Sequence, residues 1–223
     1  PISKDSGFLW VNHEYIVAST LYNRRVKASD KTRAMVDLER SLVGGSCLLI
    51  NYSNNKGWQV NAKSQRSFRL DAASKIPLVG PVDRGDVEGT FANCSGGLTP
   101  WGTILTCEEN TNKFCSSSYG WSKYYRMKPD DYGWVVEVDL QTKKARKLTS
   151  LGRFEHEGAC VVLSKNNHVV VYMGDDASSQ CMYKFISKKP FIKNKDDHSE
   201  LLVDGDLYVA NFVEKKWEIL NPA

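Results

Sequence analysis

Short strand-like runs separated by turn residues recur along most of this sequence, and they restrict the fold more than any other feature. Residues 8–15 (FLWVNHEY), 46–52 (SCLLINY) and 57–61 (GWQVN) mix aromatic, β-branched and polar side chains as strands do. Further runs of this kind are GTILTCEE, GWVVEVDL, KARKLTSL, GACVVLS, HVVVYMGDD, CMYKFIS, LYVANF and KWEIL. So many short strands with tight turns predict an all-β sandwich, barrel or propeller.

Residues 32–43 (TRAMVDLERSLV) form the stretch with a helical pattern. Met35, Leu38 and Leu42 recur at i, i+3 and i+7, and a Gly-Gly pair follows. This spacing predicts a helix. Residues 53–56 (SNNK) have the composition of a tight turn and predict a hairpin between the runs on either side.

The spacing of hairpin-like units favours a β-propeller among these folds. YGWVVEVDLQTKKARKLTSLGRF and HVVVYMGDDASSQCMYKFIS each contain two strand-like runs around a turn. They follow one another at about 40 residues, which is typical of a four-stranded blade. We expect residues 1–223 to be a single β-propeller domain with no second domain evident. That length would supply four or five blades, so we expect an incomplete ring and a fragment of a longer protein.

Charge and hydropathy argue against two kinds of partner. The net charge is +4 and no dense arginine block is present, so nucleic-acid binding has no support. No apolar run reaches the roughly 18 residues of a membrane-spanning helix, so we expect no membrane span. The sequence does not predict an oligomeric state.

The cysteines stand singly, without a C-x-x-C pair. This spacing argues against a zinc knuckle or a thioredoxin-type site. An even number leaves disulfides open, and the other interpretation is that most of them are small buried hydrophobic residues. The six are Cys47, Cys94, Cys107, Cys115, Cys160 and Cys181.

Carboxylates lie mostly where strand-like runs begin or end. They are Glu14 after LWVNH, Glu108 and Glu109 after TILTC, Asp175 and Asp176 after VVVYMG, and Glu155 and Glu157 before GACVVLS. Strand ends at one face of a propeller converge on its centre, where such acids could together bind calcium, which takes six to eight oxygen ligands. The alternative is that each acid is a solvated turn residue.

Several segments resemble, in the same order, those of the PhoX-type alkaline phosphatases. They are GFLWVNHEY, GTFANCSGGLTPWGTILTCEEN, GRFEHEGA, VVVYMGDD, YKFIS and LLVDGDLYVANF. The resemblance implies a metal-dependent hydrolase that acts on small phosphorylated substrates. It also implies a β-propeller whose central site holds Fe3+ and Ca2+.

The resemblance also implies roles for particular residues. Cys94 in NCSGG would be the thiolate ligand of the iron, and Arg153 in GRF would be the catalytic residue that meets a phosphate oxygen, since its planar fork matches phosphate. The implied acidic metal ligands are Glu14, Glu108 or Glu109, Glu157, and Asp175 or Asp176. Because members of the family carry an export signal, we expect the intact protein in the periplasm or outside the cell.

Two other functions stay open. One is a propeller that keeps calcium for its structure and binds a partner or a carbohydrate, and the other is a calcium-dependent, lactonase-like hydrolase. Cys94 discriminates among them, because calcium has little use for a thiolate. His13 and His156, each beside a candidate acid, either orient a ligand carboxylate or pack without a catalytic role.

Overall fold

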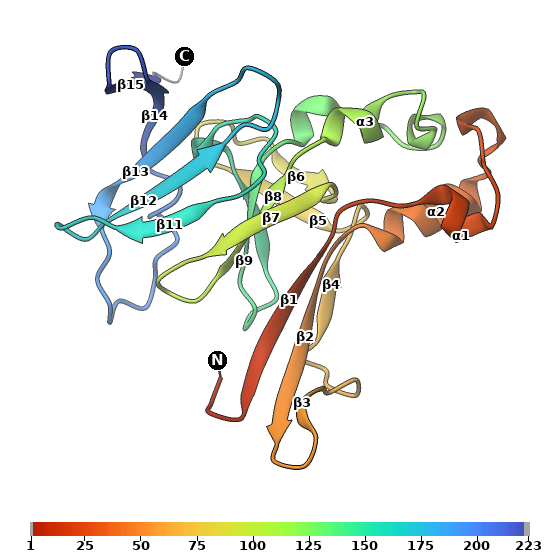
Figure 1. Ribbon diagram of the computed structural model, residues 1–223, viewed down its shortest axis with the longest axis horizontal. Coiled ribbons are helices and arrows are strands. Elements are labelled where there is room, and N and C mark those ends of the chain that lie inside the picture. The colour runs from red at the N-terminus through yellow and green to blue at the C-terminus, as the bar shows by residue number, and fades with distance from the viewer. Residues whose placement is uncertain (1, 221–223) are drawn as a thin grey trace.

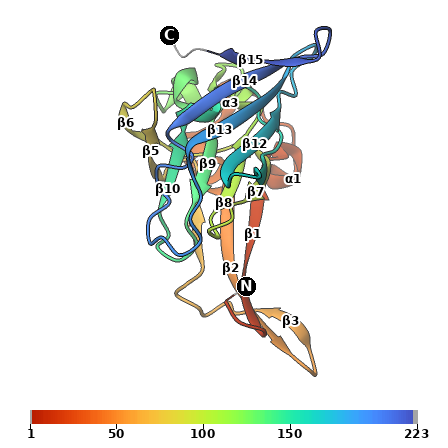
Figure 2. The same ribbon diagram turned by 90° about the vertical axis from the view of Figure 1, so that its left-hand side faces the viewer.

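Three β-sheets and a group of short helices make up the computed structural model, which describes residues 2–220. Figure 1 shows the helices gathered on one side, the C-terminal sheet on the other and the N-terminal sheet extending below. The view in Figure 2 shows how far the N-terminal sheet projects from the rest. The described chain is mostly β, as the sequence predicts, and none of its three sheets closes on itself.

The first sheet is antiparallel and has four strands, with β2 pairing with the other three. Its strands are β1 (Ser6–His13), β2 (Gly44–Ser53), β3 (Gly57–Val60) and β4 (Phe68–Leu70). The predicted hairpin at residues 53–56 is confirmed, since β2 ends at Ser53 and β3 begins at Gly57. Gly57 has a φ of +66°, a conformation that glycine adopts without strain.

The second sheet has six strands in the order β6-β5-β10-β9-β8-β7. Its strands are β5 (Lys75–Val79), β6 (Gly85–Glu88), β7 (Asn93–Leu98), β8 (Ile104–Glu108), β9 (Val135–Val138) and β10 (Ala145–Leu148). Only β5 and β10 run parallel. Strand β7 lies at the edge of this sheet, where it contacts β1 of the first sheet and β11 of the third.

The third sheet is an antiparallel meander of five strands. Its strands are β11 (Cys160–Leu163), β12 (His168–Gly174), β13 (Met182–Pro190), β14 (Gly205–Asn211) and β15 (Lys216–Leu220). The sequence predicts all five, because each carries alternating or continuous apolar residues between turn residues. The three sheets therefore differ in strand number, and a regular four-stranded repeat is not seen in the described residues.

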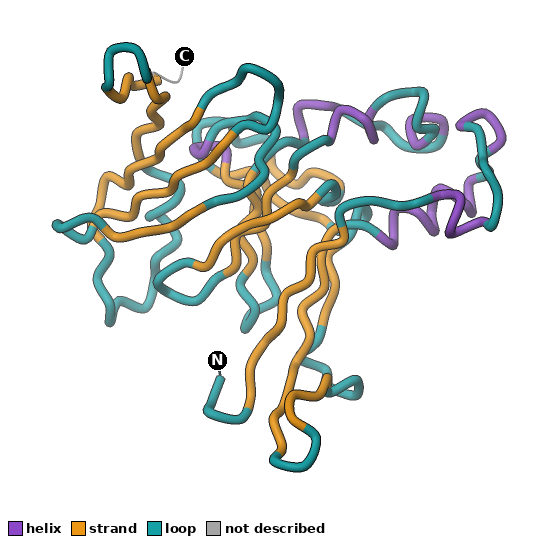
Figure 3. Tube along the Cα trace, in the orientation of Figure 1, coloured by secondary structure: helices purple, strands orange, loops and turns teal. Residues whose placement is uncertain are grey.

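The three α-helices are short and lie on one side of the molecule (Figure 3). They are α1 (Ala18–Tyr22), α2 (Arg33–Leu42) and α3 (Thr111–Cys115), with the 3-10 turns η1 (Ala28–Asp30), η2 (Trp121–Lys123), η3 (Pro129–Asp131) and η4 (Thr149–Leu151). No helix in the described residues is long and apolar enough to cross a membrane.

Helix α2 confirms the predicted helix, and Thr32 caps its N-terminus. The Thr32 Oγ1 accepts a hydrogen bond from the Met35 backbone N at 3.3 Å. The buried face differs from the apolar pattern that predicts the helix, because Leu38 is 44% exposed and Glu39 is fully buried. This face is selected by tertiary packing rather than by hydrophobic periodicity.

Buried polar contacts make the burial of Glu39 possible. Its Oε2 accepts hydrogen bonds from Lys31 Nζ at 2.7 Å and Trp121 Nε1 at 2.8 Å. Its Oε1 accepts one from the Tyr22 hydroxyl at 3.1 Å. A buried carboxylate needs such partners, and these contacts join α2 to the chain around η2.

Three large apolar clusters hold the sheets and helices together. Between the second and third sheets the cluster includes Leu105, Val135, Leu148, Val171 and Phe185. Between the first and second sheets it includes Cys47, Leu70, Ile76, Val136 and Val138. Under the helices it includes Val36, Phe91, Phe114, Trp121 and Tyr132. Burial of each apolar side chain of this size stabilises the fold by about 1.5–3 kcal/mol. The region around β7 lies where these packed layers adjoin.

Candidate metal centre

One thiol and two carboxylates meet beside β7. Ligand atoms of Glu14, Cys94 and Glu109 all lie within 4.8 Å of one another. Glu14 follows the end of β1, Cys94 lies in β7, and Glu109 follows the end of β8. The structure thus brings together three of the residues that the sequence predicts, from two different sheets. We call these three residues the acid–thiol cluster.

A β-bulge presents Cys94 to the cluster. In the β7–β8 pair, Asn93 lies opposite Glu108 and Gly96 lies opposite Thr106. Two residues of β7 therefore face one residue of β8, and the local twist of the strand changes. A Cβ on Gly96 would lie 1.9 Å from the Leu105 carbonyl oxygen, so this close approach requires glycine.

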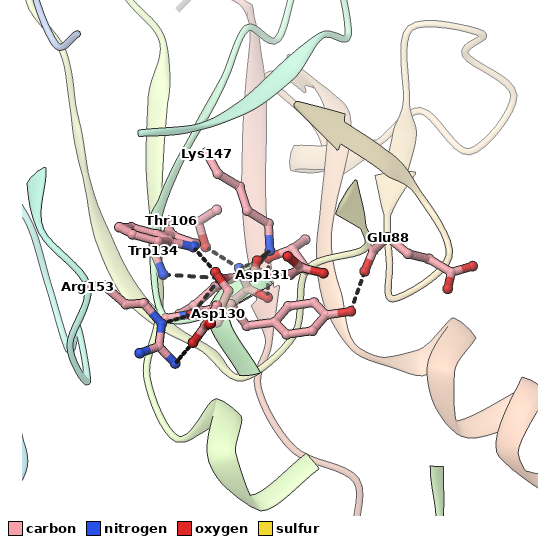
Figure 4. Close-up of polar contacts among 12 residues, drawn as sticks. Glu88, Thr106, Asp130, Asp131, Trp134, Lys147 and Arg153 are labelled. Carbon is pink, nitrogen blue, oxygen red and sulfur yellow. Dashed lines mark hydrogen bonds and ion pairs between the residues drawn. The ribbon is translucent and has the colours of Figure 1, made fainter. Parts of the chain in front are cut away.

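Glu108 and Glu109 lie in different environments. Glu108 is fully buried, and its Oε1 lies 2.7 Å from Lys147 Nζ. Its Oε2 accepts hydrogen bonds from the backbone N of Gly133 at 2.9 Å and of Trp134 at 3.1 Å. Figure 4 shows Lys147 and Trp134 in this network. Both oxygens of Glu108 are engaged away from the cluster, so the geometry favours Glu109 as the ligand and gives no support to Glu108.

Asp176 adjoins the cluster from the third sheet. Together with burial, its side chain raises the pKa of the Glu109 carboxyl, and its backbone N donates to the Glu155 carbonyl at 3.0 Å. Asp175 instead accepts a hydrogen bond from the Ala177 backbone N at 3.1 Å. Of the two adjacent acids that the sequence leaves open, the geometry favours Asp176.

Negative charge accumulates around Glu109. Burial and the neighbouring acids Asp176 and Glu14 together raise its pKa to about 7. The nearby Cys94 thiol acts in the opposite direction. Carboxylates placed this close repel one another unless protons or cations offset their charge.

Burial and the same negative charge raise the pKa of the Cys94 thiol. Its pKa is raised to about 12 by burial, by the adjacent Glu109 carboxylate and by the charges of Glu14 and Glu157. Glu157 also accepts a backbone hydrogen bond from Ser95 at 2.9 Å through its carbonyl. A bound cation reverses these effects, because it stabilises thiolate and carboxylate together. The set of one soft donor and several hard donors fits a transition metal together with calcium.

The metal-free protein is expected to lose stability as the pH rises from about 5 to about 8. The folded-state pKa of Glu109 is about 7, above its ordinary value of 4.5, so between these values the folded chain binds more protons than the unfolded chain. The free energy of unfolding therefore falls with rising pH, by on the order of 1 kcal/mol. Thermal melting of the chelator-treated protein at both pH values measures this change. In Glu109→Gln most of the difference should disappear, and an undiminished difference would contradict the assignment.

Tyr15 and Asn110 belong to the site, and sequence reasoning missed both. The Tyr15 pKa is raised to about 12, first by burial and then by Glu14 and Glu109. The Asn110 Nδ2 donates to Glu109 Oε1 at 2.5 Å. Each directly follows a predicted acidic ligand in the segments NHEY and CEEN, and this adjacency was the available signal.

The structure does not bring Arg153 to the cluster. Its Nε donates to the Tyr132 carbonyl at 2.9 Å and its Nη2 to the Pro129 carbonyl at 3.0 Å. The Nη2 also lies 3.8 Å from an Asp130 carboxylate oxygen, as Figure 4 shows. These contacts anchor the loop around η3. The catalytic role of Arg153 stays a prediction, and its side-chain contacts support a structural role.

The two histidines next to candidate acids make their side-chain contacts away from the acid–thiol cluster. His156 is fully buried, its Nε2 lies 3.0 Å from the Gly152 carbonyl, and its ring packs on Phe154 at a centroid distance of 3.6 Å. Burial lowers the His156 pKa to about 4. The Nε2 of His13 lies 2.9 Å from Ser46 Oγ. Neither ring is hydrogen-bonded to an acid of the cluster in the described residues.

Comparisons with known proteins give two matches. The model of the family "Alkaline phosphatase PhoX" matches residues 1–221. The structure is also similar to that of Pseudomonas fluorescens PhoX in complex with vanadate, a transition state analogue, with a TM-score of 0.80 and 28% sequence identity. This similarity covers 94% of this chain and 43% of that chain, so the chain spans less than half of that relative. No curated protein matches the chain.

Proposed function

Because the chain belongs to the PhoX family of alkaline phosphatases, we propose that it carries the metal site of an enzyme that hydrolyses phosphate monoesters. The observation that carries this proposal is the approach of Glu14, Cys94 and Glu109 to within 4.8 Å. The similar Pseudomonas fluorescens protein binds vanadate as a transition state analogue. This supports the proposal that the present chain also takes part in phosphoryl chemistry.

The proposed cofactors are Fe3+ and Ca2+. The thiolate of Cys94 is the donor suited to iron, since soft ligands select transition metals. The carboxylates of Glu14, Glu109, Glu157 and Asp176 are the donors suited to calcium, which prefers oxygen. The raised pKa values of Cys94 and Glu109 support cation binding, because these groups repel one another without it.

The residues of the site then have distinct tasks. Cations bound there would offset the negative charge on the phosphoryl oxygens as the transition state forms. Asn110 fixes the orientation of the Glu109 carboxylate through their hydrogen bond. Burial and Glu14 raise the pKa of the Tyr15 hydroxyl, and the Lys113 ammonium lies 4.6 Å from the centroid of the Tyr15 ring. This positive charge favours the approach of an anionic substrate.

The same proposal extends to the architecture and the location. Glu14, Glu109 and Asp176 follow strands of three different sheets. Acids at strand ends that share one centre are what a β-propeller produces, and we therefore retain the incomplete β-propeller as the proposed fold. The resemblance to exported phosphatases supports a periplasmic or extracellular location for the intact protein.

A calcium-only protein is the second candidate, either as a binding module or as a lactonase-like hydrolase. The presence of the Cys94 thiol within the cluster does not favour it, because calcium rarely uses sulfur ligands. The described cysteines are all free, so Cys94 is available as a ligand.

Hydrolysis of p-nitrophenyl phosphate by the protein supplied with iron and calcium tests the proposal. Glu109→Gln is expected to lower kcat/KM by at least about 100-fold, since a ligand carboxylate becomes a neutral amide. The control is Glu214→Gln, whose exposed side chain pairs with Lys216, and it should keep the parental rate. A metal-loaded parent without phosphomonoesterase activity would refute the proposed function.

A further inference from the structure

The acid–thiol cluster spans two sheets that no backbone ladder connects. Strand β1, which leads to Glu14, belongs to the first sheet, and β7, which carries Cys94, is the edge of the second. Strand β1 pairs only with β2 among the described strands. The separation of Glu14 from Cys94 must therefore be set by side chains.

The Asn12 side chain makes this connection. Its Nδ2 donates hydrogen bonds to the carbonyl oxygens of Cys94 at 3.0 Å and Ser95 at 3.2 Å. These are the two residues of the β7 bulge, which lack a regular partner in β8. One amide group from β1 thus holds the backbone segment that presents the thiol.

The other end of the same amide holds β8. The Asn12 Oδ1 accepts hydrogen bonds from Thr106 Oγ1 at 2.8 Å and from Trp10 Nε1 at 2.7 Å. An indole N–H can only donate, so the Asn12 oxygen must face it, and the orientation of the amide is determined. Both donors and both lone pairs of the amide are used.

Each strand held by Asn12 carries one member of the cluster or leads directly to it. Asn12 lies in β1, two residues before Glu14, which follows the end of that strand. Thr106 lies on β8, which ends at Glu108, directly before Glu109. Cys94 accepts the amide bond itself. Among the described residues of β1, Asn12 is the one whose side chain hydrogen-bonds to both β7 and β8.

We propose that Asn12 is a positioning residue that sets the distances between the Cys94 sulfur and the carboxylates of Glu14 and Glu109, and thereby the affinity of the site for a thiolate-binding metal. This rests on the proposed function in one respect, namely that the cluster binds a metal. The alternative is that Asn12 only joins two sheets. In that case its loss changes the free energy of unfolding and leaves the metal affinity of the folded protein unchanged.

Asn12→Asp separates these roles because it predicts effects of opposite sign. The substitution nearly preserves size but replaces both N–H donors with an oxygen that repels the carbonyls of Cys94 and Ser95. It also adds a negative charge near the cluster, which by electrostatics alone would strengthen cation binding. A positioning role predicts weaker binding by about 10- to 100-fold, as for other residues that orient metal ligands.

The experiment is a Co2+ titration of the folded, metal-free protein, followed by the sulfur-to-cobalt charge-transfer absorption. The parent is expected to show this band, and Cys94→Ser is expected to lack it. Asn12→Asp should bind about 10- to 100-fold more weakly, with a weaker or shifted band. Trp10→Phe removes one bond to Oδ1 and leaves both donors, so it should stay within about threefold of the parent. Near-ultraviolet circular dichroism checks that each variant is folded.

Asn12→Leu, of similar size and without charge, is the second variant and should also weaken Co2+ binding. It serves as the test if Asn12→Asp does not fold. Parental or tighter binding in a folded Asn12 variant would overturn the positioning role while the proposed metal site stands. A parent that binds Co2+ without the sulfur band would overturn the thiolate site and the positioning role together.

Discussion

Replacing Cys94 with serine is expected to remove iron from the protein while the fold remains. Cys94 is the thiol of the acid–thiol cluster, and the other donors there are carboxylates, which do not select iron over calcium in the same way. A serine hydroxyl keeps its proton near neutral pH and binds iron weakly. We expect the iron affinity to fall by more than about 100-fold, beyond the effect of residues that only orient a ligand.

Cys160→Ser is the matched control for this prediction. Cys160 is a free, exposed cysteine in β11, and its replacement should change neither the iron content nor the melting temperature noticeably. Iron content measured by elemental analysis, together with visible absorption, compares the three proteins. Full iron content in Cys94→Ser would exclude the thiolate assignment. A lower melting temperature with unchanged metal would support a buried hydrophobic role instead.

Among the substitutions considered, Lys147→Met is expected to cause the largest decrease in the free energy of unfolding. Lys147 and Glu108 are fully buried, and their charged atoms lie 2.7 Å apart. Burial lowers the Lys147 pKa, and the charge of Glu108 opposes that effect. Without Lys147, the negative charge of Glu108 stays buried, and only the backbone N–H groups of Gly133 and Trp134 donate to its carboxylate. The expected cost is about 3–5 kcal/mol in the free energy of unfolding.

The double variant Glu108→Gln/Lys147→Met tests whether this cost comes from an unpaired charge. A glutamine at position 108 still accepts the backbone hydrogen bonds from Gly133 and Trp134 and carries no charge to bury. The double variant should therefore be more stable than Lys147→Met, with a coupling of about 1–3 kcal/mol. Urea unfolding of the parent, both single variants and the double variant measures this. Strictly additive losses would contradict the account.

The strands of this fold could be predicted where side chains alternate. The five strands of the third sheet and the β2–β3 hairpin match runs that the sequence marks with apolar alternation and turn residues. Strand β7 was not predicted as a strand, because its NCSGGL sequence contains two glycines and no alternation. It becomes a strand by pairing with β8 around the bulge at Cys94, and such pairing between segments is not visible in the local sequence.

The site could be predicted only to within adjacent residues. The pairs Glu108–Glu109 and Asp175–Asp176 contain identical chemistry, and a strand sends neighbours to opposite sides. In the first pair, Lys147 of another strand binds Glu108, and Glu109 is the member that faces the cluster. The role of Asn12 was not visible either, since it depends on carbonyl groups of a bulge. Sequence gives the residue types of the site, and tertiary contacts decide which ones meet.

The iron and calcium content of the purified protein shows whether the acid–thiol cluster and its neighbouring acids bind both metals. Elemental analysis after dialysis against metal-free buffer measures both metals in one sample. We expect both to be retained, because a thiol and two carboxylates meet at Glu14, Cys94 and Glu109. Treatment with a chelator should remove both and lower the melting temperature, since metal bound to the folded state stabilises it. A protein that retains neither metal, and melts at the same temperature with and without chelator, would contradict metal binding at this site.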